Sequence, residues 1–313
     1  MQAGDPQAHD DTSGASANAQ RAPLASVVVP AHDEEAVIGR LLDALTEGVE
    51  PGRIDVVVAC NGCSDRTADV ARSHGARVVE VDRASKIAAL DAGDKAATVF
   101  PRAYVDADVV LSGTMVAALA EALAEPGVLC AAPPLVAESA GRPWAVRAFY
   151  DVWPAIPYMR DRHVGSGVFA LSAEGRARFG DWPDIVNDDL FARALFTRDE
   201  RRVVGTEPFV VQAPWSVRSL VKRRTRIHAG NMQAATHPEL RDLPGLHESS
   251  GPWWRAVVDE PRLAPAALPY AAINGLAKYN ARRQLRAAGP IAWNRDETTR
   301  QAPTPASAAQ GQA

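Results

Sequence analysis

The chain has 313 residues, of which 47% are hydrophobic, and its formal net charge is -4. This length and composition allow a sizeable buried core and predict one large domain with an appendage. The charge gives no overall attraction to nucleic acid, which argues against a nucleic-acid partner. No stretch approaches the roughly 20 apolar residues of a membrane span, and nothing at the N-terminus resembles a signal peptide.

The two ends of the chain differ in composition from the rest. Residues 1–22 are rich in Ala, Gly, Ser and Gln, and residues 298–313 are similar. Segments of this kind bury too little apolar surface to order themselves. We therefore predict disordered tails at 1–22 and 298–313, a main domain at 23–235 and a C-terminal helical extension at 236–297.

Apolar strands and helical segments alternate through the N-terminal half. Strands are predicted at Ser26–Val29, Ile54–Ala59 and Arg77–Val81. The first one stops at Pro30 and passes into acidic residues that suit a helix N-terminus. Alternation of this kind is typical of an α/β fold with a mostly parallel sheet and helices on both faces. Ligands bind beyond the carboxyl ends of such strands, where the polar clusters of this chain lie.

Two carboxylates follow the apolar run Ala103–Val105. Alternate residues of a strand face the same way, so Asp106 and Asp108 can share one hard cation, Mg²⁺ or Mn²⁺. An Asp-x-Asp triplet alone more often marks a solvated turn. It gains weight here from the polar clusters that follow the earlier strands.

Three cysteines are too few and too scattered for a disulfide framework, which predicts a cytoplasmic protein. Cys60 and Cys63 form a Cys-x-x-Cys pair, for which a redox or a zinc site is the functional alternative. A zinc site needs two more ligands, and a redox motif is expected to open a helix. We therefore expect both thiols to fill space around a turn.

Four motifs, taken in order, resemble the successive landmarks of family 2 glycosyltransferases with the GT-A fold. They are Pro30–Glu35, Asn61–Thr67, Lys86–Gly93 and Asp106–Asp108. The resemblance covers roughly residues 24 to 230. It implies an inverting enzyme that moves a sugar from a nucleotide-diphosphate sugar to an acceptor hydroxyl.

The resemblance also implies how a sugar donor is held. It assigns the base and ribose to positions at the ends of the first two strands. The chain departs from the family at Cys60-Asn61, where two acidic residues are usual; the asparagine oxygen can still accept a hydrogen bond from a base. The residues implied are Pro30, Ala31, His32, Glu34 and Asn61.

For the diphosphate, the resemblance implies Asp106 and Asp108 as metal ligands and Lys86 as a phosphate contact. The basic run Arg218–Asn231 lies where the family often has a mobile loop that ends in an Arg-Trp motif. Arg223 and Arg226 are the residues expected to close over the phosphates, because guanidinium groups make bidentate contacts with phosphate oxygens. The Trp is absent here. His228 is a further candidate ligand for the cation.

The segment Asp181–Phe191 resembles the one in which the family places an acidic pair at the start of a helix. This resemblance implies that Asp189 is the general base and Asp188 its support. Two acidic residues at a helix start are also explained by their favourable interaction with the helix dipole. The turn Gly165, Ser166 and Gly167 precedes a strand, and its small residues would let the backbone approach an acceptor.

Three other functions are alternatives to a glycosyltransferase. A catalytically degenerate nucleotide-sugar binding module is the main alternative, because Asn61 carries no charge and no Trp follows Arg226. A dehydrogenase needs a glycine-rich turn after the first strand, and Pro30–Glu35 offers acidic side chains instead. A nucleotidyltransferase shares much of the architecture, but the glycine-rich loop with arginine that it needs near the start is absent.

The segment Leu263–Ala277 is apolar, is interrupted by prolines and is followed by Lys278, Arg282 and Arg283. Such a segment can lie on an anionic membrane surface, at the inner face of the membrane, or pack against its own domain. The sequence leaves the acceptor open among a sugar, a lipid-linked compound and a small molecule. A lipid-linked acceptor would suit the basic C-terminal region.

Overall fold

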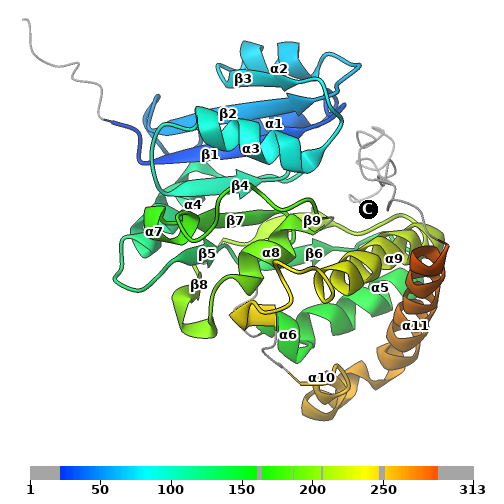
Figure 1. Cartoon of the computed structure of the whole chain (residues 1–313). Helices are drawn as coiled ribbons and strands as arrows, with labels where there is room; N and C mark the ends of the chain where they lie inside the picture. The colour runs from blue at the N-terminus through cyan, green and yellow to red at the C-terminus, as the bar shows by residue number, and fades with distance from the viewer. Residues whose placement is uncertain (1–21, 161–163, 186, 206, 247–250, 288–313) are drawn as a thin grey trace, which may run out of the picture.

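The computed structural model describes residues 22–160, 164–185, 187–205, 207–246 and 251–287 (Figure 1). Apart from Ala22, the two predicted tails lie outside the described residues, as do residues 288–297 of the predicted extension.

A seven-stranded sheet forms the centre of the fold, with strand order β3-β2-β1-β4-β7-β5-β8. Strand β7 is antiparallel to both of its neighbours, and the other pairings are parallel, so a mostly parallel sheet is confirmed. A second, two-stranded parallel sheet joins β6 and β9. The strands are β1 Ala25–Ala31, β2 Ile54–Asn61, β3 Arg77–Val81, β4 Arg102–Val105, β5 Cys130–Ala132, β6 Leu135–Glu138, β7 Val168–Leu171, β8 Arg201–Val203 and β9 Phe209–Gln212.

Helices lie between the strands and dominate the C-terminal part of the chain (Figure 1). The α-helices are α1 Ile38–Ala44, α2 Thr67–Ser73, α3 Lys86–Ala96, α4 Gly113–Leu123, α5 Trp144–Val152, α6 Pro157–Arg160, α7 Ala173–Arg176, α8 Asp188–Ala194, α9 Val217–Ala234, α10 Arg255–Asp259 and α11 Ala264–Arg286. Short 3-10 helices occupy Trp153–Ala155, Arg198–Glu200, Pro244–Leu246 and Pro261–Leu263.

The start of the chain differs from the prediction in two ways. β1 continues through Pro30, which pairs in register with Ala59, instead of stopping there. The acidic residues that follow do not open a helix, since α1 has no acidic residue in its first turn. Asp33 instead accepts a hydrogen bond from the backbone N–H of Ser64 at 2.6 Å. This hydrogen bond therefore connects the loop after β1 to the loop after β2.

The central strands bury both faces, as an α/β sheet requires. Val27 and Val29 of β1 belong to one apolar cluster, whereas Val28, between them, belongs to another on the opposite face. Ile38 of α1 packs in the first cluster and Leu90 of α3 in the second. Helices therefore cover both faces of the sheet.

A buried carboxylate fixes α3 against β4. Asp94 is 3% exposed and accepts hydrogen bonds from Arg102 at 2.7 Å and from the hydroxyl of Tyr104 at 2.8 Å. Arg176 of α7 pairs with its other oxygen. Because a buried charge needs partners, this network ties three elements together beside the start of the Asp106 loop.

Three helices form a second apolar region beside the sheet. α11 packs along α9 and α5, which Figure 1 shows as neighbouring helices at one side of the molecule. Phe149 of α5, Leu220 of α9 and Ile273 of α11 share one buried cluster. The apolar segment Leu263–Ala277 therefore packs against its own domain. Among the described helices, none combines the length and apolar character that a bilayer crossing requires.

Candidate functional site

One cavity of about 1130 Å³ lies at the carboxyl ends of β1, β2 and β4 and reaches α5, α9 and α11. Most of the predicted site residues line it, although they come from distant parts of the sequence. Ala31 and Gly165 do not. Those that do are Pro30, His32, Glu34, Asn61, Lys86, Asp106, Asp108, Ser166, Gly167, Asp188, Asp189, Arg223, Arg226 and His228.

Lys86 connects two of the predicted acidic groups. Its Nζ lies 2.7 Å from Oδ1 of Asp106 and 2.8 Å from Oδ1 of Asp188. Lys86 is the first residue of α3, where the helix dipole disfavours a cation. The two carboxylates outweigh this cost, and a residue that breaks a local helix preference in this way is typical of a functional site.

Burial and charge act against each other at this bridge. Burial by itself lowers the pKa of Lys86, but Asp106 and Asp188 together raise it, so the lysine stays protonated. Burial raises the pKa of Asp188, with Lys86 opposing that shift. The carboxylate of Asp188 therefore depends on the lysine for its charged state.

The chain places a glycine turn between the two acidic loops. Because β7 runs antiparallel to β4, with Val168 opposite Val105, the residues before β7 meet the residues after β4. The backbone N–H of Asp106 donates to the carbonyl of Gly167 at 2.8 Å. This pairing brings the turn against the acidic loop at the cavity.

The glycines of this turn approach carboxylates closely. A Cβ at Gly165 would lie 3.0 Å from Cβ of Asp189, and one at Gly167 would lie 3.1 Å from Oδ2 of Asp106. Both glycines also have positive φ, at 121° and 106°. The small residues therefore admit the two aspartates, and the approach of an acceptor to this turn stays a prediction.

Asp189 is held by backbone donors at the start of α8. Its Oδ2 accepts from the N–H of Ser166 at 2.9 Å, and its Oδ1 accepts from the N–H of Leu190 at 2.8 Å. The predicted helix start at Asp188 is confirmed. Asp189 lines the cavity with a fixed orientation, which is what a group that removes a proton from a bound hydroxyl needs.

The loops after β1 and β2 form the opposite rim. Asn61 is fully buried, and its Nδ2 donates to the carbonyl of Ala31 at 2.8 Å. Its Oδ1 is buried and has no hydrogen-bond partner among the described residues. A buried acceptor of this kind is costly unless a donor reaches it, so this atom suits an N–H of a ligand. Glu34 and His32 line the same rim.

The basic segment is not a loop, contrary to the expectation for residues 218–231. It belongs to the 18-residue helix α9, which begins after the cap Ser216. Burial lowers the pKa of Arg226, and the charge of Asp106 is one of the effects that oppose this shift. Arg226 lines the same cavity as Asp106, while Nη1 of Arg223 lies 3.4 Å from the carbonyl of Gln212.

The donor set fits a divalent cation at Asp106 and Asp108 but does not gather His228 with them. Carboxylate oxygens are the ligands that Mg²⁺ and Mn²⁺ prefer, and Lys86 shows that the pocket beside Asp106 accommodates positive charge. β4 ends at Val105, so Asp106 and Asp108 follow the strand, and the strand alternation from which their shared direction was predicted does not extend to them. Nε2 of His228 lies 3.3 Å from Oδ1 of Asn274 on α11, and burial lowers the pKa of this histidine to about 4.

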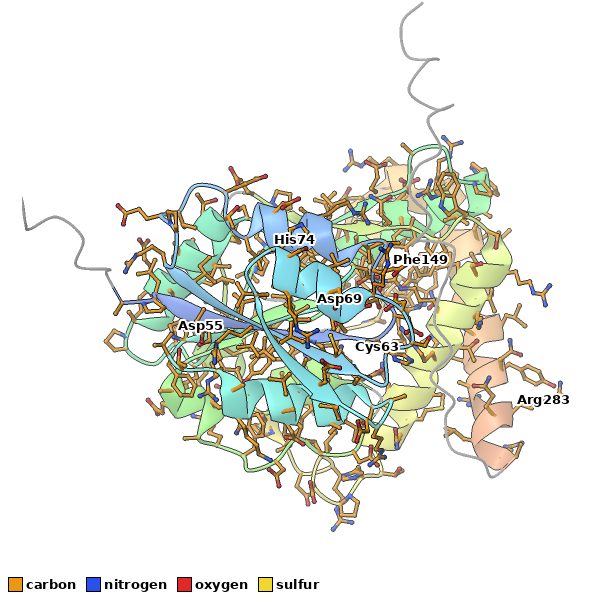
Figure 2. All side chains as sticks on the ribbon, turned by 90° about the horizontal axis from the view of Figure 1, so that it is seen from above. Asp55, Cys63, Asp69, His74, Phe149 and Arg283 are labelled. Atoms are coloured by element: carbon orange, nitrogen blue, oxygen red, sulfur yellow. The ribbon has the colours of Figure 1, made fainter. Side chains whose placement is uncertain are left out.

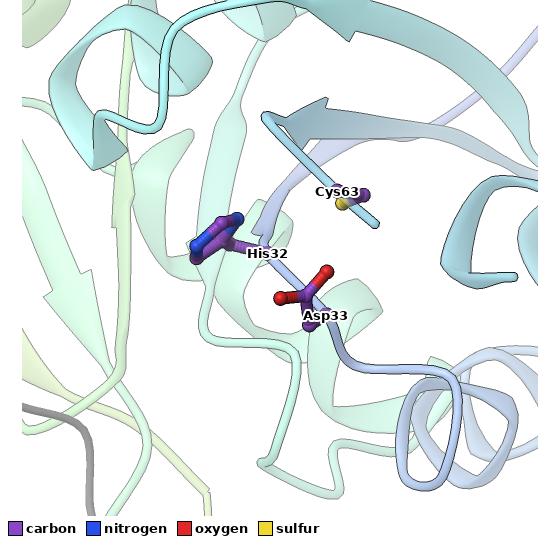
Figure 3. A group of neighbouring side chains, drawn as sticks. All are labelled: His32, Asp33 and Cys63. Carbon is purple, nitrogen blue, oxygen red and sulfur yellow. The ribbon is translucent and has the colours of Figure 1, made fainter. Parts of the chain in front are cut away.

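A different set of metal-type side chains lies at the rim of β1 and β2. Ligand atoms of His32, Asp33 and Cys63 lie within 4.8 Å of one another, and Figure 3 shows these side chains on the loops that follow β1 and β2. Sequence reasoning weighed Cys63 only with Cys60. Burial raises the pKa of Cys60 to about 12, so that thiol is inert and fills space as predicted.

Sequence reasoning missed the aromatic wall of the cavity. This wall comes from α5, α6, α11 and the segments next to them, and the detectable signal was the density of aromatic residues in Trp144–Tyr158. Arg224 of α9 faces it. The aromatic residues of this wall are Phe149, Tyr150, Trp153, Tyr158, Trp253 and Tyr270.

Comparison with known proteins agrees with this geometry. The chain matches the model described as Glycosyl transferase family 2 over residues 26–173. Residues 26–173 belong to glycosyltransferase family 2. This glycosyltransferase domain contains β1 to β7 and the Asp106–Asp108 turn.

Two relatives from Staphylococcus aureus are described as 4,4'-diaponeurosporenoate glycosyltransferase. That of strain MRSA252 is 31% identical over 208 residues, which are 62% of this chain and 52% of the relative. That of strain bovine RF122 / ET3-1 is 30% identical over the same length. The chain thus spans about half the length of these relatives.

A solved structure shares the GT-A fold of the domain. The mannosyltransferase PcManGT from Pyrobaculum calidifontis, in complex with GDP-Man and Mn²⁺, superimposes with a TM-score of 0.54 at 21% identity. The likeness covers 87% of this chain and 78% of that one. The predicted fold class is therefore confirmed.

Proposed function

We propose that this protein is an inverting glycosyltransferase that moves a sugar from a nucleotide-diphosphate sugar to an acceptor hydroxyl. The observation that carries the proposal is the convergence of Asp106, Asp188 and Asp189 with Lys86 and Arg226 in one cavity. The family of residues 26–173 supports the same reaction class.

Asp189 acts as the general base in this proposal. It removes the proton of the acceptor hydroxyl as that oxygen attacks the anomeric carbon on the face opposite the leaving group. Its two backbone hydrogen bonds keep the carboxylate aimed into the cavity, which lowers the cost of orienting it. Asp188 is the support, since its ion pair with Lys86 fixes the first turn of α8.

The diphosphate is proposed to lie between the acidic turn and α9. Asp106 and Asp108 would hold Mg²⁺ or Mn²⁺, which supplies Lewis-acid stabilisation to the departing diphosphate. Arg226 donates hydrogen bonds to phosphate oxygens from the helix side, and Arg223 completes the positive wall at the mouth. Lys86 keeps the carboxylates from repelling the anionic donor.

Base and ribose are proposed to bind at Pro30, His32, Glu34 and Asn61. The buried Oδ1 of Asn61 supports this placement, because a base N–H would satisfy it. Ala31 contributes through its carbonyl, which orients the amide of Asn61. The GDP-Man and Mn²⁺ of the PcManGT complex support a nucleotide sugar and a divalent cation as ligands of the class.

A catalytically degenerate binding module is the second candidate. The uncharged Asn61 and the absence of Trp after Arg226 favour it, because both positions depart from the family pattern. The module would bind a nucleotide sugar without transferring the sugar. Product formation separates it from the enzyme.

Peripheral contact with a membrane is proposed for the outward face of α11. Leu268 is 77% exposed there and Tyr279 is 63% exposed. Arg283 lies on the same helix and points away from the molecule in Figure 2. Apolar side chains flanked by cations suit an anionic surface, and they would place the enzyme at the cytoplasmic face.

A thermal-shift screen of nucleotide sugars, with and without Mn²⁺, tests the donor site. Ligand that binds only the native state raises the melting temperature, so one nucleotide should stabilise the protein in a metal-dependent way. Asp108→Ala should remove the metal dependence and leave the fold intact. An equal shift in that variant would contradict the assignment of the cation to Asp108.

A further inference from the structure

We propose that the helical end of the cavity binds an acceptor that has an apolar body and an anionic group, and that Arg224 receives the anion. The inference rests on the proposed transfer reaction for its catalytic context and names the acceptor class of that site.

The helical end presents an apolar surface of aromatic rings. Phe149 stacks on Tyr270 with 4.9 Å between ring centres, and Trp253 lies 5.2 Å from Tyr270. Trp153 meets Tyr150 edge-on at 5.6 Å. All five rings line the cavity. Phe149, Tyr150 and Tyr270 are at most 8% exposed and back it, whereas Trp153 and Trp253 are partly exposed and can stack on a ligand.

Arg224 carries a positive charge into this apolar surface. Its Nε donates to Oδ1 of Asn274 at 3.2 Å, and its Cζ lies 5.5 Å from the centre of the Phe149 ring. No carboxylate of the described residues forms an ion pair with Arg224. Burial lowers its pKa, with Tyr270 as the largest opposing influence. A partly buried guanidinium without an acid beside it favours an anionic ligand.

The neighbours of Arg224 add to this preference. His228, one helical turn away, also contacts Asn274 and stays neutral, since burial holds its pKa at about 4. Lys278 of α11 lines the cavity nearby. The carboxylates of the lining come from the loops around the sheet and the start of α8. Those residues are Glu34, Asp106, Asp108, Asp184, Asp188 and Asp189.

The helix geometry separates this anion site from the donor site. Arg224 and Arg226 are two positions apart, which places their side chains roughly 200° apart around α9. Arg226 feels the charge of Asp106, whereas Arg224 contacts α11 and α5. The donor diphosphate is therefore bound by the guanidinium group of Arg226, and the acceptor anion by that of Arg224.

One acceptor can reach both the base and the anion site. Tyr158, Asp189 and Arg224 all line this cavity, whose volume is about 1130 Å³. One acceptor molecule can therefore place its hydroxyl near Asp189, its apolar part over the aromatic rings and its carboxylate or phosphate at Arg224.

Isothermal titration with eight-carbon probes tests the anion site without donor or metal. The probes are octanoate, octyl phosphate and 1-octanol, with acetate as the anion that lacks an apolar body. We expect octanoate or octyl phosphate to bind at least about tenfold more tightly than 1-octanol, because a charge-assisted hydrogen bond adds to the same apolar contact. Acetate should bind more weakly than octanoate. The tighter of the two octyl anions identifies carboxylate or phosphate.

Arg224→Gln should reduce the affinity for both octyl anions to that for 1-octanol. Arg218→Gln is the matched control, since Arg218 is an exposed arginine of the same helix that does not line the cavity. Arg224→Lys keeps the charge and should keep most of the preference, which separates loss of charge from loss of folding.

Equal binding of octanoate and 1-octanol by the unaltered protein would overturn the inference. An equal loss in Arg218→Gln would overturn it too, because the anion would then be binding to general surface charge. The titrations contain neither nucleotide nor Mn²⁺, so an anion preference together with a failed nucleotide screen would reject the proposed transferase and leave the anion site standing.

Discussion

The two ends of the cavity treat charge in opposite ways. At the sheet end, Asp106 and Asp188 are balanced inside the protein by Lys86. At the helical end, Arg224 lies among aromatic rings with an amide as its hydrogen-bond partner. The sheet end is thus built to keep its own charges in place, and the helical end is built to receive a charge from a ligand.

The largest expected effect is at the junction of the two ends. Asp189→Asn keeps the side chain's shape and one acceptor oxygen, so the protein should fold, but the base is lost and transfer should fall by about a thousandfold or more. A product assay with the donor identified by thermal shift measures this. Unchanged melting together with normal turnover would exclude Asp189 as the base.

The second test removes the positive charge of Lys86, which pairs with Asp106 and Asp188 at the sheet end. Lys86→Met leaves two carboxylates without their cation, and breaking a buried ion pair costs about 3 kcal/mol of unfolding free energy. Arg66→Met is the control, because the Arg66–Glu35 pair is exposed and should cost less than about 1 kcal/mol. Urea denaturation of both variants measures the difference. Equal losses would show that the Lys86 bridge is no more than a surface contact.

The third test compares packing under the sheet with packing in the helical region. A Cβ at Gly93 of α3 would lie 2.5 Å from Cγ1 of Val28, so Gly93→Ala should destabilise the protein by about 1–3 kcal/mol. Gly275 of α11 has no atom within 4 Å of such a Cβ, and Gly275→Ala should stabilise by up to about 1 kcal/mol. Thermal melting gives both signs, and a loss of stability in both variants would refute the contrast.

The smallest effect concerns the neutral histidine of the helical end. Burial first, and Arg224 second, lower the pKa of His228 from 6.5 to about 4. The folded state therefore favours the neutral ring, and this stability is present above pH 6.5 and is lost as the pH falls through 4. His228→Gln should lose less stability than the unaltered protein between pH 7 and pH 4.5. Denaturation at both pH values checks this, and parallel losses would count against it.

The sequence predicted much of the sheet end. β3 has the predicted bounds, α8 begins at the predicted acidic pair, and thirteen positions before α9 were named for the site, most of them from the resemblance to a known family. Eleven of these thirteen positions line one cavity, because parallel strands bring their carboxyl ends to one edge and residues that follow apolar strands meet there. Their roles stay a prediction. The predicted loop at 218–231 was wrong, since a capping serine and helix-compatible residues make it α9.

The helical end was not predicted, because its function depends on contacts between helices that are far apart in sequence. Phe149 and Tyr270 are separated by more than a hundred residues and meet only when α11 packs on α5. No spacing rule connects such residues. Likewise, Cys63 was read with Cys60, whereas the fold gives it His32 and Asp33 as neighbours.

The sequence by itself determined the order of the motifs along the chain, the acidic pair at the start of α8 and the family of residues 26–173. Tertiary structure decided which charges are paired. Lys86 reaches Asp106 and Asp188 only because α3, the β4 turn and α8 converge, and Arg224 is left with an aromatic wall because α5 and α11 cover it. Local preferences fix elements along the chain, but the balance of charge in a cavity depends on which elements the fold places around it.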